Sequence, residues 1–171
     1  MEANLIELKG LTKRFGALTA LDGVDMTIGR GKIVGLLGPN GSGKTTMIKI
    51  LNGLLTPTSG TALIEGEAPG PKTKAVVSYL PDKPYFASWM RVRDAMELFA
   101  DFYRDFDRVK ADDMCRELGL DENRQIKTLS KGTQEKMQLM LVMSRHAHLY
   151  LLDEPLAGVD PAARAAILDT I

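Results

Sequence analysis

Apolar and polar residues alternate along parts of this chain in the manner of strands. Half-buried strands are predicted where the two classes alternate, at residues 5–8 and 24–28, and residues 60–65 resemble another short strand. Strands buried on both faces are predicted at the continuous apolar runs, residues 32–37, 75–80 and 149–152. A glycine turn and a loop rich in glycine and proline are predicted at residues 29–31 and 66–74.

The remaining segments show the spacing of helices. One helix is predicted at residues 45–51, and a longer helical pattern extends from Val92 to about Leu141. Its apolar positions form two groups, which are Val92, Ala95, Met96, Phe99 and Phe102, then Met114, Cys115 and Leu118. Gly119 predicts a helix end, and a last helix is expected from Pro161 to Ile171. Strands followed by helices imply an α/β fold with a parallel core sheet.

Composition narrows the class of protein. A chain of 171 residues suits one domain. Lys plus Arg and Asp plus Glu each number 22, and this zero net charge argues against a broad nucleic-acid surface. The sequence has no apolar stretch of membrane-spanning length, and residues 1–4 lack the basic start of a signal peptide. Cys115, the single cysteine, is expected to be a buried thiol, and a cytosolic location fits these features.

A glycine-rich loop follows the apolar run at 32–37. Its residues fit G-x-x-x-x-G-K-[ST] at every defined position: Gly38, Pro39, Asn40, Gly41, Ser42, Gly43, Lys44 and Thr45. The glycines let backbone N–H groups turn towards a phosphate, and the helix that follows directs its positive dipole end at the same anion. Lys44 can reach the β- and γ-phosphates, and the Thr45 hydroxyl can ligate Mg²⁺. Thr46 is assigned to the same nucleotide site.

Two acidic residues follow the apolar run at 149–152. In phosphate-loop enzymes, an acid at the end of a neighbouring buried strand enters the Mg²⁺ shell, and Asp153 fits this role. Glu154 can then accept a proton from the attacking water. Taken alone, the pair could also be an acidic turn that closes a strand. Together with residues 38–45, it indicates hydrolysis of a nucleoside triphosphate.

A second helix start lies at residues 129–133, Leu-Ser-Lys-Gly-Thr. Ser130 fits an N-cap, and Gly132 leaves the start of the helix open to an anion. On physical grounds alone, an ordinary capped helix is the favoured interpretation of this segment.

Taken together, these motifs resemble the ABC ATPase family. The resemblance rests on their order: the phosphate loop at 38–45, Leu-Ser-Lys-Gly-Thr at 129–133, then Leu-Leu-Asp-Glu-Pro at 151–155. It implies a RecA-like P-loop core of about residues 1–84 and 146–171. It also implies a small N-terminal antiparallel β subdomain and an inserted helical subdomain at about 85–145. Phe15 matches the aromatic residue that stacks on adenine, although it could also be a core aromatic. Asp160 matches the family's D-loop aspartate, and Asp160 before Pro161 also suits an N-cap.

The resemblance further implies an assembly. Two such domains, as a homodimer or a heterodimer, pair head to tail, so that Ser130 and Gly132 of one contact the γ-phosphate held by the other. The implied cofactors are ATP and Mg²⁺, and the implied partners are transmembrane subunits of a transporter at the cytoplasmic face of a membrane. Nucleic acid is not expected as a partner. A non-transport ABC ATPase acting on nucleic acid or ribosomes, or a regulatory nucleotide-binding module, remains as an alternative.

The chain departs from the family pattern at several positions. Asp82 stands where the family has a glutamine that ligates Mg²⁺ and orients water, and we expect Asp82 to act in catalysis or through a bridging water. Lys131 and Thr133 replace a glycine and a glutamine of the family's Leu-Ser-Gly-Gly-Gln, and Lys131 would add positive charge near the partner's nucleotide. These departures weakly resemble those of bacterial export ATPases, so export is favoured over import.

Two further expectations concern histidines and aromatic residues. The family has a switch histidine about 30 residues after the acidic pair, whereas this sequence ends at Ile171, and we therefore expect a C-terminally truncated domain with poor turnover. His146 and His148 are expected at the surface or at a strand edge. The side chains at positions 85, 86, 89 and 90 suit either a groove for a membrane subunit or a plain hydrophobic core.

Overall fold

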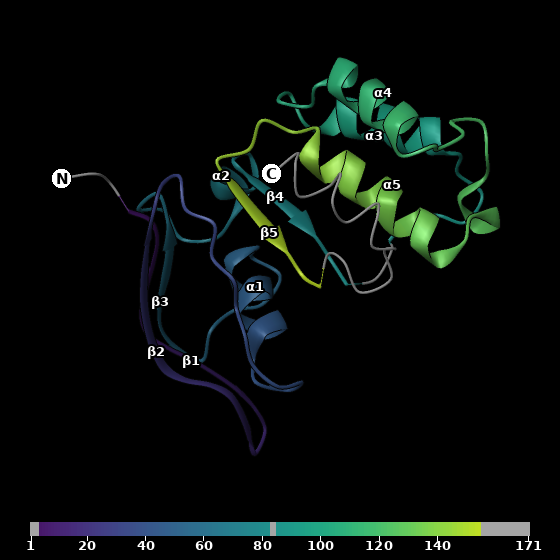
Figure 1. Cartoon of the computed structure of the whole chain (residues 1–171). Coiled ribbons are helices and arrows are strands. Elements are labelled where there is room, and N and C mark those ends of the chain that lie inside the picture. The colour runs from purple at the N-terminus through teal and green to yellow at the C-terminus, as the bar shows by residue number, and fades with distance from the viewer. Residues whose placement is uncertain (1–3, 83–84, 155–171) are drawn as a thin grey trace. The chain divides into compact units, whose positions relative to one another are not determined.

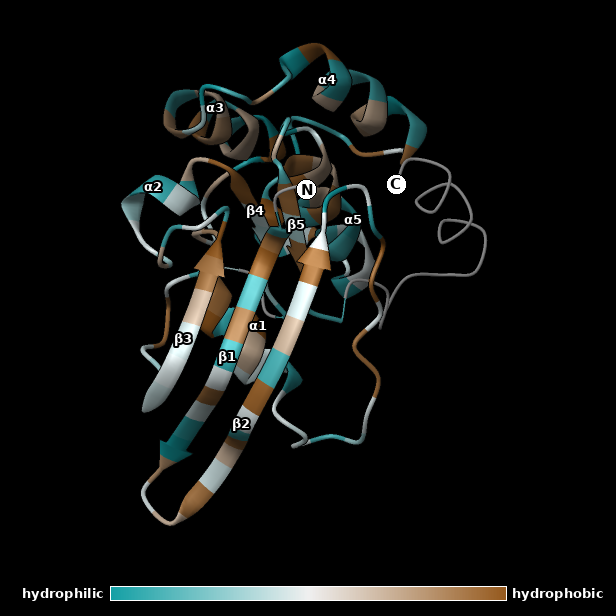
Figure 2. Ribbon diagram, turned by 90° about the vertical axis from the view of Figure 1, so that its left-hand side faces the viewer, coloured by the Kyte–Doolittle hydropathy of each residue, from teal (hydrophilic) through white to brown (hydrophobic). Residues whose placement is uncertain are grey.

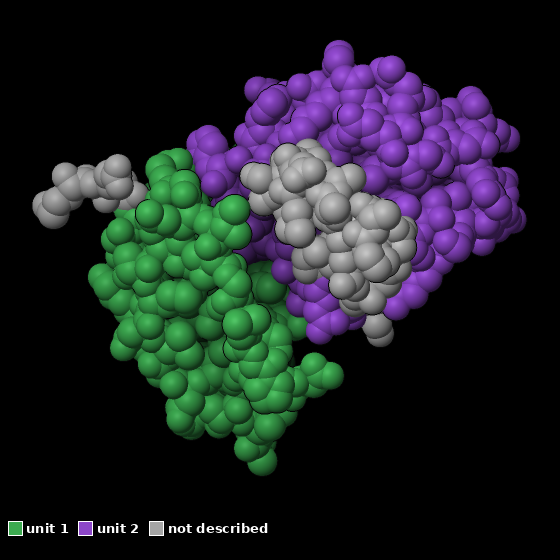
Figure 3. Space-filling model, viewed as in Figure 1, with its two compact units in different colours: residues 1–77 green, residues 78–171 purple. Residues whose placement is uncertain are grey.

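The computed structural model describes residues 4–82 and 85–154. Two compact units make up the chain, Met1–Val77 and Ser78–Ile171 (Figure 3). Asp160 and the helix expected from Pro161 lie outside the described residues.

An antiparallel sheet dominates the first unit. Strands β1 (Asn4–Phe15), β2 (Leu18–Gly29) and β3 (Ser59–Ile64) form it in the order β2-β1-β3 (Figures 1 and 2). Leu8 on β1 lies opposite Met26 on β2 and Ala62 on β3. Leu8, Leu11 and Ile64 are buried, so one face of the sheet forms a core. The half-buried strands and the N-terminal antiparallel subdomain expected from the sequence are confirmed.

Helix α1 (Lys44–Leu51) supplies the other side of this core. Met47, Ile48, Ile50 and Leu51 are buried, and the helix contacts β2 and β3. Gly53 ends the helix with φ 68, and the N–H of Leu54 donates to the carbonyl of Lys49 (2.8 Å). The short helix α2 (Pro71–Lys74) lies where only a loop was predicted. Pro71 pre-sets the first turn, and the Thr73 hydroxyl accepts from the N–H of Gly70 (2.8 Å).

The apolar run at 32–37 does not form the predicted buried strand. It has no regular secondary structure, and Ile33 and Leu37 are 86% and 96% exposed. A run of apolar residues shows only that burial would be favourable, whereas a central strand also requires hydrogen-bonding strands on both sides. No strand among residues 4–82 and 85–154 pairs with this run.

The second unit combines a small sheet with helices. Strands β4 (Val77–Leu80) and β5 (Leu149–Leu152) pair, and both arrows point the same way in Figure 1. Helices α3 (Val92–Phe102), α4 (Arg108–Glu117) and α5 (Lys131–Met143) follow β4, with a short 3-10 turn at Ile126–Thr128. The two predicted strands at 75–80 and 149–152 and the helical character of this region are thus confirmed. The long helical pattern forms three helices, because Asp107 caps α4 and Gly119, with φ 66, follows its end.

One continuous core joins these helices. Val92, Ala95, Met96 and Phe99 of α3 pack with residues of α4 and α5. Cys115 is buried in this core, as expected, and burial raises the pKa of its thiol to about 11. Phe102, which was assigned to the same apolar face, is 76% exposed, because it stands at the end of α3, where the chain turns away at Tyr103. In the described part of the chain, no helix combines the length and the apolar character needed to span a bilayer.

Candidate functional site

The glycines of the loop at 38–45 have no side chains that would keep a ligand away from the backbone of the loop. Gly38, Gly41 and Gly43 have φ values of 157°, 83° and 91°, a region that other residues rarely adopt. Gly43 is also constrained by space, because a Cβ there would collide with the carbonyl oxygen of Ala20 on β2. A side chain at position 43 would therefore push the start of α1 away from the sheet. The sequence motif and the local packing explain the same glycine independently.

Lys44 lies at the centre of this loop. Its Nζ donates to the carbonyl oxygens of Gly38 (2.8 Å) and Pro39 (2.9 Å) and lies 3.4 Å from the Ser42 hydroxyl. The N–H of Ser42 donates to the carbonyl of Pro39 (3.2 Å) and closes a tight turn. The ammonium group is therefore held inside the loop by acceptors of the loop itself. A cation fixed at this place favours the binding of an anion such as a phosphate.

The first turn of α1 adds to this electrostatic preference. Gly43 is the N-cap, no side chain caps the helix, and no acidic residue lies in its first turn. The positive end of the helix dipole is therefore not offset locally. Asn40, Gly41 and Ser42 are exposed, whereas Thr45 and Thr46 are half-buried at the start of the helix.

Phe15 ends strand β1 at the turn that contains Gly16. Its ring is 45% exposed, and Lys13 Nζ lies 5.0 Å from the ring centroid. An exposed aromatic face beside a cation suits stacking against a nucleotide base. The role of Phe15 in binding adenine stays a prediction.

Three acidic residues gather at one edge of the sheet of the second unit. Asp82 follows β4 by one intervening residue, and Asp153 and Glu154 follow β5 directly. The N–H of Asp153 donates to the carbonyl of Leu80 (3.0 Å), which extends the pairing of the two strands to the acidic pair. Because the carboxyl ends of parallel strands share an edge, Asp82 and Asp153 are brought together. Asp153 is 4% exposed, whereas Asp82 and Glu154 are exposed.

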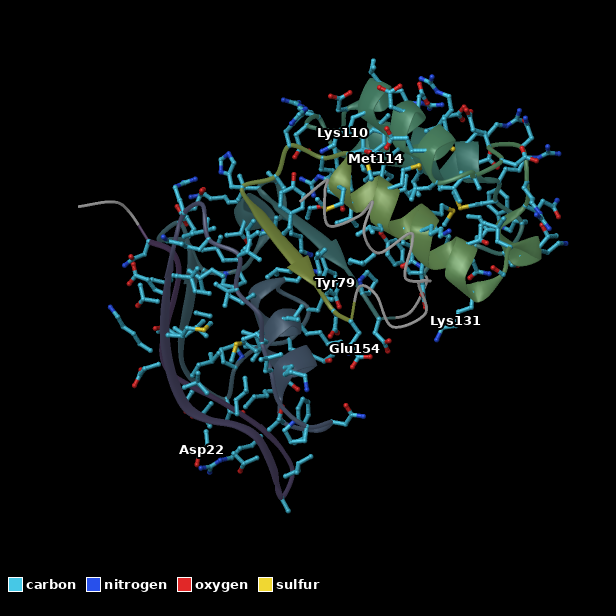
Figure 4. The ribbon with its side chains drawn as sticks, in the orientation of Figure 1. Asp22, Tyr79, Lys110, Met114, Lys131 and Glu154 are labelled. Atoms are coloured by element: carbon cyan, nitrogen blue, oxygen red, sulfur yellow. The ribbon has the colours of Figure 1, made fainter. Side chains whose placement is uncertain are left out.

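Tyr79 belongs to this edge, although no feature of the sequence singled it out. Burial raises the pKa of Tyr79 above its usual 10.0, and the carboxylates of Asp153 and Asp82 raise it further. Figure 4 labels Tyr79 and Glu154 near the carboxyl ends of β4 and β5. A tyrosine one residue before the end of a predicted strand is common in sheets, so the sequence held no specific signal.

The backbone of Glu154 is unusual. Its φ is 53°, and Glu65 is the other residue besides glycine that has a positive φ in the described ranges. A left-handed conformation at such a residue costs about 1–3 kcal/mol and is often found at functional sites. The Glu154 side chain is exposed. This feature supports a functional role that the sequence motif had already suggested.

The segment at 129–133 begins helix α5, as predicted. Ser130 is its N-cap, and the Ser130 hydroxyl accepts from the N–H of Thr133 (3.2 Å) and lies 2.7 Å from the Thr133 hydroxyl. Lys131 is exposed and lies 3.7 Å from Glu135 in an i,i+4 ion pair. Gly132 is half-buried in the first turn. The capped helix is present, and the phosphate contact of Ser130 and Gly132 stays a prediction.

The histidines lie at the surface, as expected. His146 and His148 are exposed in the connection between α5 and β5. His146 Nε2 lies 3.2 Å from Asp107. The N–H of Lys110 and the His146 ring together lower the pKa of the Asp107 carboxyl.

The aromatic segment after Asp82 divides between core and surface. Met90 is buried, and Phe86 packs against the helical core with its ring centroid 6.1 Å from that of Phe99. Trp89 is 70% exposed and Tyr85 is also exposed. Neither of the two expectations, a groove or a plain core, describes all four residues. Trp89 and Tyr85 expose apolar surface to solvent, whereas Phe86 and Met90 hold this segment against the helical core.

The donor set fits a magnesium ion that is held chiefly by a nucleotide. Within the described ranges, no group of three His, Cys, Asp or Glu residues could hold a metal without other ligands. Mg²⁺ commonly takes one or two protein oxygens and completes its shell with phosphates and water. The buried carboxylate of Asp153 in the second unit is a hard oxygen donor of this kind, and the hydroxyl of Thr45 in the first unit is, separately, another.

A family comparison agrees with this interpretation. The model of the family described as ABC transporter matches residues 21–157. ABC transporter ATP-binding protein YtrB of Bacillus subtilis (strain 168) is 32% identical over 166 residues, covering 96% of this chain. The probable multidrug ABC transporter ATP-binding protein YbhF of Escherichia coli (strain K12) is 36% identical over 169 residues, covering 94% of this chain. The chain spans 57% of the length of the first relative and 29% of the second.

Further relatives include a resistance protein and solved structures. The daunorubicin resistance ATP-binding protein DrrA3 of Streptomyces coeruleorubidus is 30% identical over 179 residues and covers the whole chain, which spans 57% of that relative. A solved structure described as the ATP binding subunit of an ABC transporter matches with a TM-score of 0.87 and 30% identity, over 97% of this chain and 72% of its own. A putative ABC transporter ATP-binding protein from Pyrococcus furiosus matches with a TM-score of 0.82 and 27% identity, over 96% of this chain and 82% of its own.

Proposed function

Because this chain belongs to the ABC transporter family of ATP-binding proteins, we propose that it binds MgATP through residues 38–45 and hydrolyses its terminal phosphate to drive transport. One observation carries the proposal: Lys44 Nζ is held between the carbonyls of Gly38 and Pro39 in a loop that glycine makes accessible. This arrangement presents a fixed cation and a helix N-terminus to the same anion.

The phosphate chain of ATP is bound by backbone and side-chain groups of the loop. The N–H groups around Gly41 and Gly43 donate to phosphate oxygens, and Lys44 balances their charge. Phe15 stacks on the adenine. Phosphoryl transfer depends mainly on positioning and charge, so these contacts supply much of the rate enhancement.

The acidic edge performs the proton chemistry. Glu154 accepts the proton of the water that attacks the γ-phosphorus, and Asp82 orients that water in place of the family's glutamine. Mg²⁺, when bound, would neutralise negative charge on the phosphate oxygens. Thr45, Asp153 and Asp82 are the residues that would hold it.

MgATP turnover tests this function directly. We expect Glu154→Gln to keep nucleotide binding and to lose turnover by at least about 100-fold, the lower end of the range for a general base. Glu97→Gln, at an exposed position on α3, is the matched control and should keep turnover. Equal turnover of Glu154→Gln and the unsubstituted protein would rule out Glu154 as the base. Absence of nucleotide binding would reject the assignment of residues 38–45.

The assembly is part of the proposal. Two copies, or one copy and a second ATPase subunit, enclose ATP between residues 38–45 of one and Ser130 and Gly132 of the other. Asp160, which lies outside the described residues, is proposed as the D-loop aspartate of this assembly. Closing and opening this dimer transmits the energy of hydrolysis to transmembrane subunits at the cytoplasmic face of a membrane.

The exposed aromatic surface is the proposed contact with those subunits. Tyr85 and Trp89 are exposed on a segment anchored by Met90, and an apolar surface of this kind suits a partner helix. Trp89→Ala is expected to weaken co-purification with the membrane subunit while its melting temperature stays unchanged. Val109→Ala, at an exposed apolar position on α4, is the control. Unchanged association of Trp89→Ala would remove this surface from the proposal.

Export is the proposed direction. The names of two relatives refer to multidrug transport and to daunorubicin resistance, and these names support export. Accumulation of a fluorescent drug in cells that express the whole transporter measures the direction. Export predicts lower accumulation with the unsubstituted protein than with Glu154→Gln, and import predicts the reverse.

A further inference from the structure

Arg145 is a buried cation that neither the phosphate loop nor the acidic edge requires. It lies two residues after α5, is 2% exposed and contacts Asp105 through two nitrogens. Its Nε lies 3.1 Å from Oδ1 of Asp105, and its terminal nitrogen lies 3.0 Å from Oδ2. The guanidinium carbon also lies 3.8 Å from the ring centroid of Tyr103. This is a bidentate ion pair stacked on an aromatic ring.

Such an ion pair adds little net stability, but it fixes the distance and the orientation of the two segments that it joins. Burying the guanidinium of Arg145 and partly burying the carboxylate of Asp105 has a desolvation cost, which their attraction offsets only when the geometry is good. When apolar side chains of similar volume replace a buried ion pair, the stability of the folded protein is often unchanged or higher. A fork of two parallel hydrogen bonds, in contrast, fixes both distance and orientation. The arrangement around Arg145 therefore fixes the position of whatever it connects.

The pair of Arg145 and Asp105 connects the loop before α4 to the start of β5. The N–H of Asp107 donates to the carbonyl of Ser144 (2.7 Å), and the N–H of His146 donates to the carbonyl of Asp105 (2.9 Å). The Tyr150 hydroxyl donates to the carbonyl of Arg145. Residues 103–107 and 144–150 thus form one joint, and Arg145 lies inside it.

The joint lies between the two groups of residues to which the proposed function assigns ATP hydrolysis, one at the start of α5 and one after β5. Helix α5 begins at the Ser130 cap and ends next to the joint, and β5 leads from the joint to Asp153 and Glu154. Figure 4 labels Lys131 at the start of α5 and Glu154 after β5. The Ser78 hydroxyl donates to the carbonyl of Val142 (2.9 Å) and fastens β4 to the last turn of α5. The angle between α5 and the sheet is therefore set near residues 142–150.

A small change of that angle has a large effect at the far end of the helix. The 13 residues of α5 span about 20 Å at 1.5 Å per residue. A tilt of about 10° at the joint would move Ser130 by about 3 Å relative to Glu154. Catalytic groups must keep their places within about 0.5 Å, so such a displacement would be severe.

We propose that Arg145 is a positioning residue, whose bidentate pair with Asp105 fixes α5 against β5 and so sets Ser130 relative to the Asp153–Glu154 pair. The proposal rests on the proposed function, because it concerns the residues assigned there to ATP hydrolysis. In this role Arg145 is a positioning residue and not a catalytic one. It acts through the backbone that it holds.

Substitutions at the pair test the proposal through steady-state kinetics. Arg145→Met is expected to lower kcat for MgATP at least about tenfold, since a misplacement of about 1 Å can cost 100-fold. The KM for ATP should stay within about threefold, because residues 38–45 bind the nucleotide. Arg145→Lys keeps the charge without the fork and should recover part of kcat. Arg116→Met removes an exposed ion pair with Asp113 on α4 and should leave kcat unchanged.

A double variant separates positioning from mere stability. Arg145→Met combined with Asp105→Leu replaces the pair by apolar side chains and should restore the melting temperature lost in Arg145→Met. A positioning role predicts that kcat stays low in this stable protein. Recovery of kcat together with the melting temperature would overturn the proposal, and so would normal kcat in Arg145→Met.

Hydrogen exchange tests the joint without any assay of activity. In Arg145→Met and in the double variant, the amides of Leu149–Leu152 should exchange faster than in Arg116→Met. If the unsubstituted protein does not hydrolyse MgATP, the proposed function fails, and hydrogen exchange alone then tests the role of Arg145 in the joint. Unchanged protection of β5 would then overturn the role of Arg145. Faster exchange would support it.

Discussion

At the scale of single residues, Lys44 shows how the loop is prepared for an anion. Its ammonium group already lies within hydrogen-bonding distance of two carbonyls of the loop, so little reorganisation is needed when a phosphate arrives. We expect Lys44→Met to weaken ATP binding about 10- to 100-fold, which corresponds to the 1.5–3 kcal/mol of a hydrogen bond to a charged group. Titration with a fluorescent ATP analogue measures this loss.

Lys49→Met is the matched control for that experiment. Lys49 lies in the last turn of the same helix, where a cation interacts favourably with the helix dipole but not with the loop. Its replacement should leave ATP affinity within about twofold, since surface substitutions have small effects. Equal weakening by both substitutions would show that net charge, rather than the position of Lys44, governs binding.

Tyr79 reports on the charges at the acidic edge. The Asp82 carboxylate is one cause of its raised pKa, so Asp82→Asn should lower the pKa of Tyr79 towards the usual 10.0. Absorbance of tyrosinate during an alkaline titration, with Tyr79→Phe subtracted, measures the change. Asp101→Asn, an exposed position on α3, should leave the pKa of Tyr79 unchanged. An unchanged pKa in Asp82→Asn would place Asp82 too far away to share the site.

The same raised pKa affects stability at alkaline pH. Tyrosine ionises near pH 10 in an unfolded chain, and the folded protein keeps Tyr79 neutral to higher pH. The stability contributed by neutral Tyr79 is therefore fully present below about pH 10 and is lost as pH rises through the folded pKa. Asp82→Asn should make this alkaline loss less steep.

At the scale of elements, the start of α5 carries two roles that substitutions can separate. Ser130 caps the helix through the N–H of Thr133, and the proposed function assigns the same hydroxyl to a phosphate. Ser130→Ala should lower the free energy of unfolding by about 1 kcal/mol, the usual value of a cap. Ser130→Asp should keep stability, because aspartate is a good cap and favours a helix N-terminus. Its charge should nevertheless repel the phosphate and abolish turnover.

Urea denaturation and MgATP turnover together measure both effects. Ser88→Ala, an exposed serine outside the helices, serves as the control for each measurement. Normal turnover in Ser130→Asp would show that Ser130 is a cap alone. Low stability in Ser130→Asp would mean that the cap needs the hydroxyl itself.

Most elements could be predicted because their cause is local. Alternation in β1 and β2, helical spacing in α3 and the loop-helix motif at 38–51 are all properties of neighbouring residues. The acidic edge could be predicted as well, since Asp82, Asp153 and Glu154 follow strands whose carboxyl ends share one side.

The failures have causes at longer range. Residues 32–37 have the composition of a buried strand, but pairing depends on neighbours that composition does not reveal. Phe102 continues the apolar spacing of α3, but the helix ends there and the side chain leaves the core. Tyr79 and Arg145 were missed because their environments are made by residues distant in sequence, Asp153 and Asp105.

At the scale of the whole molecule, the proposed chemistry is divided between the two units. Residues 38–45 belong to Met1–Val77, whereas Asp82, Ser130, Asp153 and Glu154 belong to Ser78–Ile171. In the proposed dimer, a nucleotide that contacts both copies favours the state in which the copies meet.

The dimer therefore provides the last prediction. Glu154→Gln should bind MgATP without hydrolysing it and should accumulate as a dimer, because ATP links residues 38–45 of one copy to Ser130 and Gly132 of the other. Size-exclusion chromatography with light scattering, with and without MgATP, measures the mass. Glu154→Gln combined with Lys44→Met should stay monomeric, since it lacks the ammonium group that binds phosphate, and so should Glu154→Gln combined with Ser130→Asp. A dimer that forms equally in all three proteins, or without nucleotide, would mean that ATP does not lie between the copies, and the proposed route from hydrolysis to transport would lose its basis.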